Sequence, residues 1–267
     1  MLHADSRASG WGKSRMRIEH LYRYPVKGLT AEALESVAVE PGETLPWDRA
    51  FALAQGDAPF DPAEPRWLRK THFMCLMANA RAALLRASFD APSGVLLIRA
   101  PDGSTIAESP VTEAGRARLA AWLAAFLDHE ARGVPRFHYA PGHSFSDVSA
   151  KVVSIINLAS VADLAARAGA PRHHLRFRAN LYLRGAAAWS ELGCVGRELL
   201  AGRARLRVGK RISRCAATEV NPDTAERDAR PVAELREAFG HVDCGVYAEV
   251  IEGGQLAVGD AVELLPA

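Results

Sequence analysis

R-I-S-R-C-A-A-T-E-V-N-P-D-T, residues 211–224, is the stretch on which the interpretation of the whole chain depends. It follows an alternating segment, residues 203–208, that predicts a strand, so Cys215 is expected where this strand turns outward. The neighbouring Arg214 can stabilise a thiolate, which is the form of cysteine that attacks electrophiles and binds soft metals. The alternative is a small buried hydrophobic residue, because free cysteines are among the most buried residue types. The stretch alone leaves both interpretations open.

Composition narrows the class of protein without indicating a function. The chain has 267 residues, of which 49% are hydrophobic, enough for the core of one large domain or two modest ones. A formal net charge of +2 gives no reason to expect nucleic-acid binding. No apolar run approaches the roughly 20 residues of a membrane helix, and residues 1–13 lack the apolar segment of a secretory signal. We therefore expect a cytoplasmic protein without membrane association.

The four cysteines are too scattered to form the framework of a disulfide-rich protein, so we expect reduced thiols. They are Cys75, Cys194, Cys215 and Cys244.

The first hundred residues predict mainly strands. Residues 1–14 are small, polar and aperiodic, which predicts a disordered tail. Strands are predicted over residues 16–24, 34–39 and 50–54, and a hairpin over residues 83–99. The turn Pro25–Gly28 is expected to leave Lys27 exposed, and residues 67–83 are a helix candidate. We assign residues 15–105 to an N-terminal domain that forms a small barrel or curled sheet.

Residues 106–267 predict a second domain of strands with a few peripheral helices. Ser109 and Pro110 predict the start of a helix whose apolar residues repeat at helical spacing as far as Leu127. Residues 135–147 are expected to be rich in loops. A short helix is predicted over residues 231–239, and strands over residues 246–251 and 261–265. The predicted fold is therefore mainly β (α+β), with an N-terminal β-barrel-like domain followed by a second β-barrel domain.

Three segments of this second half predict an anion-binding surface. A strand over residues 151–156 runs into Asn157, which is expected to cap a helix and to leave backbone N–H groups free for an anion. Alternation along a predicted strand at 172–183 places Arg176, Arg178 and Asn180 on one face. Seven basic residues lie between positions 197 and 214 against one acidic residue, Glu198. Either a solvated strand face or an anion-binding wall explains this bunching.

The residues alone support four hypotheses. The first is a phosphate-bearing cofactor that places a soft metal against Cys215, and the second is nucleophilic or sulfur-carrying chemistry of Cys215 without a metal. The third is a structural zinc site formed by His241 and Cys244 with Cys194 or Cys215, although no paired C-x-x-C is present. The fourth is a binding module for an anionic partner. No P-loop, G-x-G-x-x-G, G-x-S-x-G or H-E-x-x-H motif is present.

Taken together, four motifs resemble those of the MOSC proteins (molybdenum cofactor sulfurase C-terminal domain). The similarity is to the two-part form with an N-terminal β-barrel, as in the mitochondrial amidoxime-reducing component and its bacterial relatives. It covers residues 17–265. The motifs are Tyr24-Pro-Val-Lys27, Trp47-Asp-Arg49-Ala-Phe51, Arg176-Phe-Arg178-Ala-Asn180-Leu181, and Ser213-Arg214-Cys215 followed by Thr218 and Asn221-Pro-Asp-Thr224.

The resemblance implies a site for a pterin-based molybdenum cofactor, with Cys215 as catalytic residue and as the protein thiolate on the metal. It also implies that the pterin and its phosphate are held by Lys27, Arg49, Asn157, Arg178, Asn180, Ser213 and Arg214.

The implied activity is that of an oxidoreductase that reduces N-hydroxylated compounds. The alternative is a carrier of a sulfurated molybdenum cofactor or of a Cys215 persulfide, without turnover of its own. The chain shows no ferredoxin-like C-x4-C-x2-C, so electrons are expected from a separate donor protein of the ferredoxin or flavoprotein type. The pyridoxal-phosphate desulfurase domain found in some MOSC fusions has no counterpart in this sequence. Neither pyridoxal phosphate nor an iron–sulfur cluster is therefore expected.

Three positions depart from the motifs of the family. Gly28 replaces the serine after the lysine, Ile212 replaces a cysteine upstream of Ser213, and Cys244 replaces the phenylalanine before Gly245-Val-Tyr247.

Overall fold

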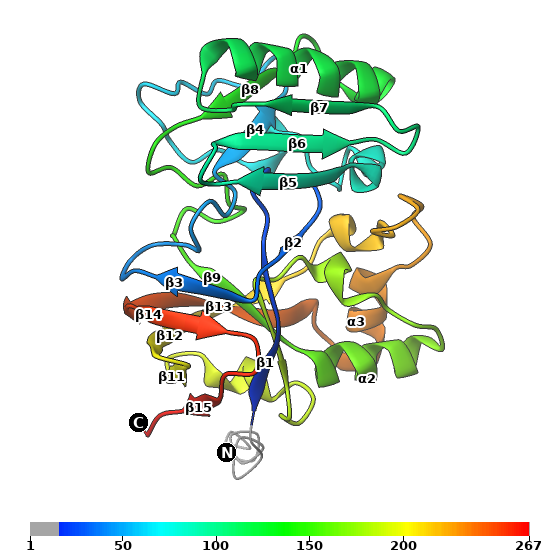
Figure 1. Cartoon of the computed structure of the whole chain (residues 1–267). Helices are drawn as coiled ribbons and strands as arrows, with labels where there is room; N and C mark the ends of the chain where they lie inside the picture. Colours follow the sequence, from blue (N-terminus) through cyan, green and yellow to red (C-terminus); the bar gives the residue numbers. More distant parts are fainter. Residues whose placement is uncertain (1–15, 267) are drawn as a thin grey trace.

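The computed structural model describes residues 16–266 as two stacked units, with helix α1 at one end and the start of β1 and strand β15 at the other (Figure 1). The chain is mainly β, and the described residues contain three α-helices. The residues expected to form a disordered tail, 1–14, lie outside the described part. The helices and strands, in chain order, are β1 (Arg17–Arg23), β2 (Glu32–Ala33), β3 (Ser36–Val39), β4 (Phe51–Ala54), β5 (Arg86–Asp90), β6 (Val95–Arg99), β7 (Thr105–Glu108), α1 (Glu113–Leu127), β8 (Arg136–Tyr139), β9 (Val153–Asn157), α2 (Leu158–Ala168), β10 (Leu181–Arg184), β11 (Glu198–Ala201), β12 (Ala204–Ser213), α3 (Pro231–Phe239), β13 (Asp243–Glu252), β14 (Gly254–Ala257) and β15 (Val262–Leu264).

The lower unit is a closed barrel. Its eight-stranded sheet has the order β15-β11-β12-β13-β9-β10-β1-β2, and the two-stranded sheet of β3 and β14 lies beside it. An antiparallel bridge between Arg17 and Ala261 joins β1 to the end of the chain, where the N–H of Val262 donates to the carbonyl of Met16 at 2.9 Å. Alternating apolar residues such as Leu199, Leu206 and Val250 fill the interior. Closure leaves the barrel without an open edge at this seam.

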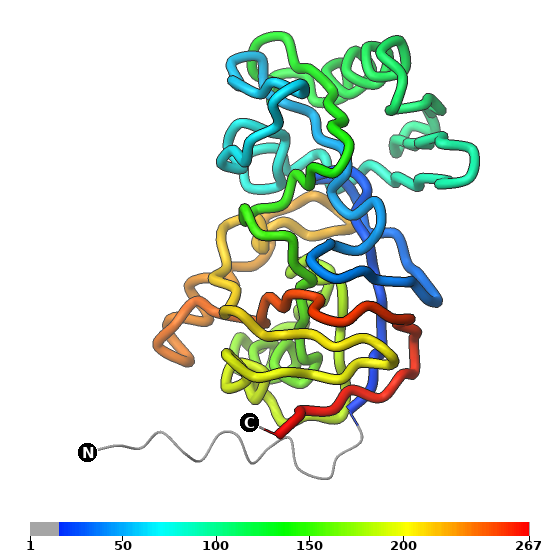
Figure 2. Tube along the Cα trace, turned by 90° about the vertical axis from the view of Figure 1, so that its left-hand side faces the viewer, coloured from blue at the N-terminus to red at the C-terminus, as the bar shows by residue number. Residues whose placement is uncertain are grey.

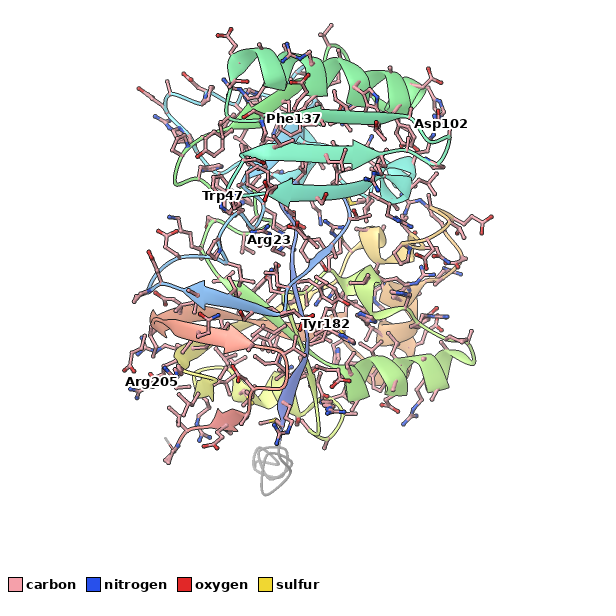
Figure 3. All side chains as sticks on the ribbon, in the orientation of Figure 1. Arg23, Trp47, Asp102, Phe137, Tyr182 and Arg205 are labelled. Carbon is pink, nitrogen blue, oxygen red and sulfur yellow. The ribbon has the colours of Figure 1, made fainter. Side chains whose placement is uncertain are left out.

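The upper unit consists of the three-stranded sheet β5-β6-β7 and the pair β4-β8, with α1 packed on β7 and β8 (Figure 1). Its core combines aromatic rings with one face of the helix, and Figure 3 shows Phe137 and Trp47 within this unit. The buried members include Phe51, Phe89, Phe137, Leu119 and Leu123.

The two units do not follow the chain order that we expected. β1 pairs with β10, and β3 pairs with β14, so residues 17–39 contribute strands to the lower barrel. The expected division between residues 105 and 106 falls inside β7, and the following helix α1 packs into the upper core. Packing therefore places the upper unit between about residues 51 and 139. A hydrophobic face is buried against a sheet that lies close in space, and this sheet can be far away along the chain.

Four local expectations were wrong. Residues 67–83 contain only two short 3-10 helices, Lys70–His72 and Ala80–Leu84. Helix α1 is capped by Thr112, whose Oγ1 accepts from Gly115 N at 3.1 Å, and not by Ser109. The segment expected as a strand at 172–183 is a 3-10 helix, His174–Phe177, before the short β10. β8 lies in a stretch, residues 135–147, that we expected to be loop.

The remaining expected elements are present with small shifts, including α2 with its Asn157 cap and α3. Within the part of the chain that the structure describes, no helix is both long and apolar enough to cross a membrane.

Candidate functional site

A cavity of about 380 Å³ lies where the two units meet. Its volume is in the range of ordinary small-molecule sites, about 300–1,000 Å³. Eight cationic side chains line it against two carboxylates, so it carries a surplus of six positive charges. Seven of the eight sequence-predicted site residues reach this cavity, and one does not. Those that line it are Lys27, Arg49, Arg178, Asn180, Ser213, Arg214 and Cys215.

Cys215 sits directly after β12, at the start of the 3-10 turn Ala216–Glu219, and is partly exposed to the cavity. Thr218 fixes this turn, because its backbone N–H and its Oγ1 both donate to the Cys215 carbonyl, at 3.0 and 2.9 Å. Figure 2 shows the segment after β12 running along the end of the lower unit that faces the upper one. The thiol is therefore presented by a rigid strand end to the space between the units.

Lys70 of the upper unit lies beside Cys215 and was not predicted from the sequence. Burial alone would lower the pKa of Lys70, but hydrogen bonding and attraction to Cys215 raise it above its ordinary value. An ammonium in this position favours an anionic ligand or side chain next to it, on the side of the upper unit. No motif contains Lys70, and only the packing of the two units brings it to Cys215.

Arg214 braces the cysteine and offers little to a ligand. Its Nε donates to the Cys244 carbonyl at 2.8 Å and its Nη1 to the Phe177 carbonyl at 2.8 Å, while Nη2 also donates to Cys244. The guanidinium lies over the Phe177 ring, with 5.4 Å from Cζ to the ring centroid. These contacts fix the end of β12 against β13, so Arg214 positions its neighbour Cys215.

Arg49 and Arg178 both lie over the ring of one tyrosine. Each guanidinium carbon lies 4.4 Å from the centroid of the Tyr24 ring, an arrangement that stabilises cations. Arg49 also pairs with Asp48 and donates to the Arg178 carbonyl at 2.9 Å. Both arginines have φ of 51°, a backbone conformation that non-glycine residues rarely adopt and that clusters at functional sites. The motifs around Tyr24, Arg49 and Arg178 therefore meet in one cluster.

Arg178 is a lining cation that no ion pair with the described residues neutralises. Its guanidinium makes no hydrogen bond or ion pair with any residue between 16 and 266, yet it lines the cavity. Burial, opposed by Tyr24 and reinforced by Arg49, lowers the pKa of Arg178, although a guanidinium stays charged at neutral pH. A half-buried cation of this kind favours an anionic ligand.

Lys27 is buried and not exposed as the turn Pro25–Gly28 suggested. Its Nζ donates to the Phe145 carbonyl at 2.8 Å and forms an ion pair with Asp147. Burial lowers the pKa of Lys27, and Asp147 opposes this shift. Burial alone would raise the pKa of Asp147, but Lys27 lowers it below its ordinary value. Asp147 is a second lining residue that the motifs did not indicate.

Asn180 and Ser213 line the cavity with side chains that are already occupied. Asn180 Oδ1 accepts from the backbone and hydroxyl of Ser154, at 3.1 and 2.7 Å, and its Nδ2 donates to the Tyr22 carbonyl at 3.1 Å. Ser213 donates to Asp243 at 2.7 Å. Both residues hold strands together at the edge of the site.

Asn157 does not line the cavity. Its Oδ1 accepts from Ala159 N at 3.1 Å and its Nδ2 donates to the Ala187 carbonyl at 2.7 Å, so it caps α2 inside the lower unit. The expectation that this helix start faces the site was wrong. The reason is that β9 lies in the middle of the sheet, and α2 leaves on the side away from the upper unit (Figure 1).

The region around this cap holds a buried carboxylate with a predictable pH effect. Burial raises the pKa of Glu191 from about 4.5 to about 7, although hydrogen bonds from Ser160 and Asn157 oppose the shift. The folded state thus favours the protonated carboxyl, whose contribution to stability is complete below pH 4.5 and is lost as the pH rises through 7.

We expect Glu191→Gln to remove this pH dependence. The free energy of unfolding is measured in urea at pH 5 and at pH 8. Its decrease between these two pH values should be smaller in the variant than in the parent, by up to about 3 kcal/mol. Other titrating groups are common to both proteins and cancel in the comparison. An equal fall in both proteins would show that Glu191 does not titrate in this window.

The predicted basic wall is divided between several surfaces. Arg205 and Arg207 pair with Glu198, and Arg205 also pairs with Glu252. Figure 3 places Arg205 at the outer edge of the lower unit, away from the junction. Only Lys210, Arg211 and Arg214 of the seven basic residues line the cavity. Arg176 also lines it, but its Nη groups bind the Glu219 carbonyl at 2.8 Å and the Asp228 carboxylate.

The three departures from the family motifs have separate structural reasons. Gly28 has φ of +85°, and a Cβ there would lie 2.9 Å from the Met74 carbonyl oxygen, so a serine would be strained. Ile212 is buried and lines the cavity. Cys244 is fully buried in an apolar cluster, and burial raises the pKa of its thiol to about 12. Cys244 is therefore a packing residue, and Cys215 is the thiol that faces the cavity.

The donor set suits an anionic ligand with a soft metal. It combines one partly exposed thiol, a lysine beside that thiol and a half-buried arginine without a hydrogen bond or ion pair to residues 16–266. Among residues 16–266, no three His, Cys, Asp or Glu side chains are grouped so that they could hold a metal ion together. The described residues therefore contain no cluster of the kind that the zinc hypothesis requires.

Solved structures similar to this chain are distant in sequence. The YUAD protein from Bacillus subtilis matches with a TM-score of 0.44 and 14% identity, over 93% of this chain and 94% of that chain. YiiM from Geobacillus stearothermophilus and YiiM from Escherichia coli match with TM-scores of 0.33 and 0.31 and identities of 20% and 19%. In both YiiM matches the similarity covers 43% of this chain and 54% of the other. No curated protein sequence matches the chain.

Two family descriptions match successive parts of the sequence. The MOSC N-terminal beta barrel domain matches residues 15–130, and the MOSC domain matches residues 135–263. Together they cover both units and every motif described above. The chain therefore belongs to the MOSC family, whose domain is associated with the molybdenum cofactor.

Proposed function

We propose that the cavity between the two units binds a pterin-based molybdenum cofactor, with the Cys215 thiolate as the protein ligand of the metal. The observation that carries this proposal is the pairing of a cavity-facing thiol with the uncompensated Arg178 on the same cavity. Among the described residues of the cavity wall, Arg178 and Lys210 are cations without a hydrogen bond or ion pair to the protein, and Lys70 lies beside Cys215. In this assignment Arg214, Asn180 and Lys27 shape the site, because their polar groups already bind the protein.

We further propose that the loaded protein is an oxidoreductase that reduces N-hydroxylated compounds. Reduction of an N–OH group to N–H consumes two electrons and two protons and releases water. The bound metal would supply the two-electron chemistry. The electrons would come from a separate donor protein of the ferredoxin or flavoprotein type. The chain itself contributes orientation and a cationic cavity that stabilises negative charge near the metal.

The second candidate function is a carrier of sulfurated cofactor or of sulfur bound to Cys215. The observation in its favour is that Cys215 is partly exposed beside Lys70, which is the environment of a reactive thiolate. Carrier and oxidoreductase share the same cysteine and differ in turnover.

Metal content tests the cofactor assignment. Protein purified from a host that makes the cofactor should contain about one molybdenum per chain, and Cys215→Ala should reduce this to background because the metal loses its protein ligand. Cys194→Ala is the matched control, since Cys194 lies buried in the barrel core. Zinc in place of molybdenum, or molybdenum content independent of Cys215, would contradict the assignment.

Turnover separates the two candidate functions. With an artificial electron donor, the loaded parent protein should convert N-hydroxylated substrates to the reduced compounds, and Cys215→Ala should not. A protein that holds molybdenum through Cys215 but shows no turnover with a panel of such substrates would be a carrier.

A further inference from the structure

A second, smaller cavity of about 170 Å³ lies behind the first, on the other side of Arg176 and Arg178. The two cavities share these arginines and Leu76, and otherwise have different walls. Both units contribute to the second cavity.

Several motif residues that do not line the first cavity line the second. The segment after Cys215 passes from one cavity to the other, because Cys215, Ala217 and Thr218 line the first, whereas Val220, Pro222 and Asp223 line the second. Tyr24 also lines only the second. The motif Asn221-Pro-Asp-Thr224 therefore has a location that the cofactor proposal does not explain.

The body of the second cavity is apolar and has the size of one ring. Leu29, Leu76, Ala83 and Val220 are buried side chains of its wall. A buried apolar cavity of about 150 Å³ binds benzene, so about 170 Å³ accommodates a six-membered ring with a small substituent.

The charged groups of the second cavity favour an anionic substituent. Three arginines line it against one carboxylate. Arg86 is engaged by Asp223 at 3.5 Å and by the carbonyls of Ala83 and Pro222. The Arg178 guanidinium has no acceptor among residues 16–266, and the buried Nε of Arg176 also lacks one. A carboxylate on the ring would supply the acceptor that these donors lack.

We propose that the second cavity is a binding site for a small monocyclic aromatic carboxylate, whose ring packs against Leu29, Ala83 and Val220 and whose carboxylate faces Arg178. The site needs no molybdenum, so cofactor-free protein tests it separately from the proposed function. Because Arg178 lines both cavities, the carboxylate and the proposed cofactor would compete for its guanidinium.

Binding of benzoate to the cofactor-free full chain tests this site. Calorimetric titration should give saturable binding, and neutral benzyl alcohol should bind at least about tenfold more weakly because it cannot pair with a guanidinium. Ala31→Leu, which extends a half-buried lining residue, should weaken benzoate binding by at least about tenfold through overpacking. Ala33→Leu is the matched control, because Ala33 is exposed on β2 and lines neither cavity.

Methyl NMR locates the ligand without relying on a variant. Benzoate should shift the methyl signals of Leu29, Leu175 and Val220, which line the second cavity, and leave those of Val148 and Val152, which line the first. Absence of saturable binding, equal affinity for benzyl alcohol, unchanged affinity in Ala31→Leu, or shifts confined to Val148 and Val152 would overturn the proposal.

Discussion

An Arg178→Met variant is expected to bind the molybdenum cofactor about 30-fold or more weakly than the parent protein, because losing one partner of a buried charge pair costs about 2–5 kcal/mol. Arg178 is the one lining arginine whose guanidinium we find without any partner in residues 16–266, so a bound anion would be its only counter-charge. Methionine keeps a long side chain that can still pack on the Tyr24 ring. The change therefore removes charge and donors more than volume.

The measurement is molybdenum per chain, after equal expression and purification. Arg205→Met is the matched control, since Arg205 pairs with Glu198 and Glu252 on the outside of the barrel (Figure 3). It should retain the molybdenum content of the parent. Equal losses in the two variants would mean that general charge, and not the position of Arg178, governs binding.

A Gly245→Ala variant is expected to lose about 3 kcal/mol or more of its free energy of unfolding. Gly245 has φ of +85°, and a Cβ there would lie 2.5 Å from the Ile155 carbonyl oxygen and 2.6 Å from Ile156 Cγ1. It would also lie 3.2 Å from Nη2 of Arg214. The methyl group would push β13 away from β9 and disturb the brace of Cys215. Loss of molybdenum should accompany the loss of stability.

Gly240→Ala separates backbone conformation from crowding. Gly240 ends α3 with φ of +73°, and a Cβ there would meet nothing within 4 Å. This variant should lose only the conformational cost of about 1–2 kcal/mol. Urea unfolding of the cofactor-free proteins measures both values. If the two variants are equally destabilised, the close packing around position 245 is not what requires a glycine there.

The sequence predicted the type of fold and most of the cavity, because both depend on local patterns and motifs. Alternation indicated the strands, and the four motifs brought Lys27, Arg49, Arg178 and Cys215 to the same place. Their individual roles were less predictable. The polar groups of Arg214 and Asn180 already form hydrogen bonds with the protein. Which partners lie nearby is decided by the packing of the barrel.

Three errors have a common physical cause. Asn157 was placed at the site because a capped helix start can bind anions, but the direction in which α2 leaves the sheet decides what it faces. Arg176 and Arg178 were placed on one strand face, but Arg176 lies in a 3-10 helix and binds Asp228, whereas Arg178 has a positive φ and lies over the Tyr24 ring. Lys70 belongs to none of the four motifs, and only the contact between the two units brings it to Cys215. Each depends on tertiary arrangement, which short-range periodicity does not encode.

The seam that joins Arg17 to Ala261 has a consequence for the order of events during synthesis. Apart from β2, the partners of β1 come more than 150 residues later, whereas the strands of the upper unit lie in one continuous stretch of chain. We therefore expect the upper unit to fold while the chain is still being made, and the barrel to close only after β15 has left the ribosome. The cavity needs both units, so insertion of a cofactor would be a late step of maturation that acts on a finished chain.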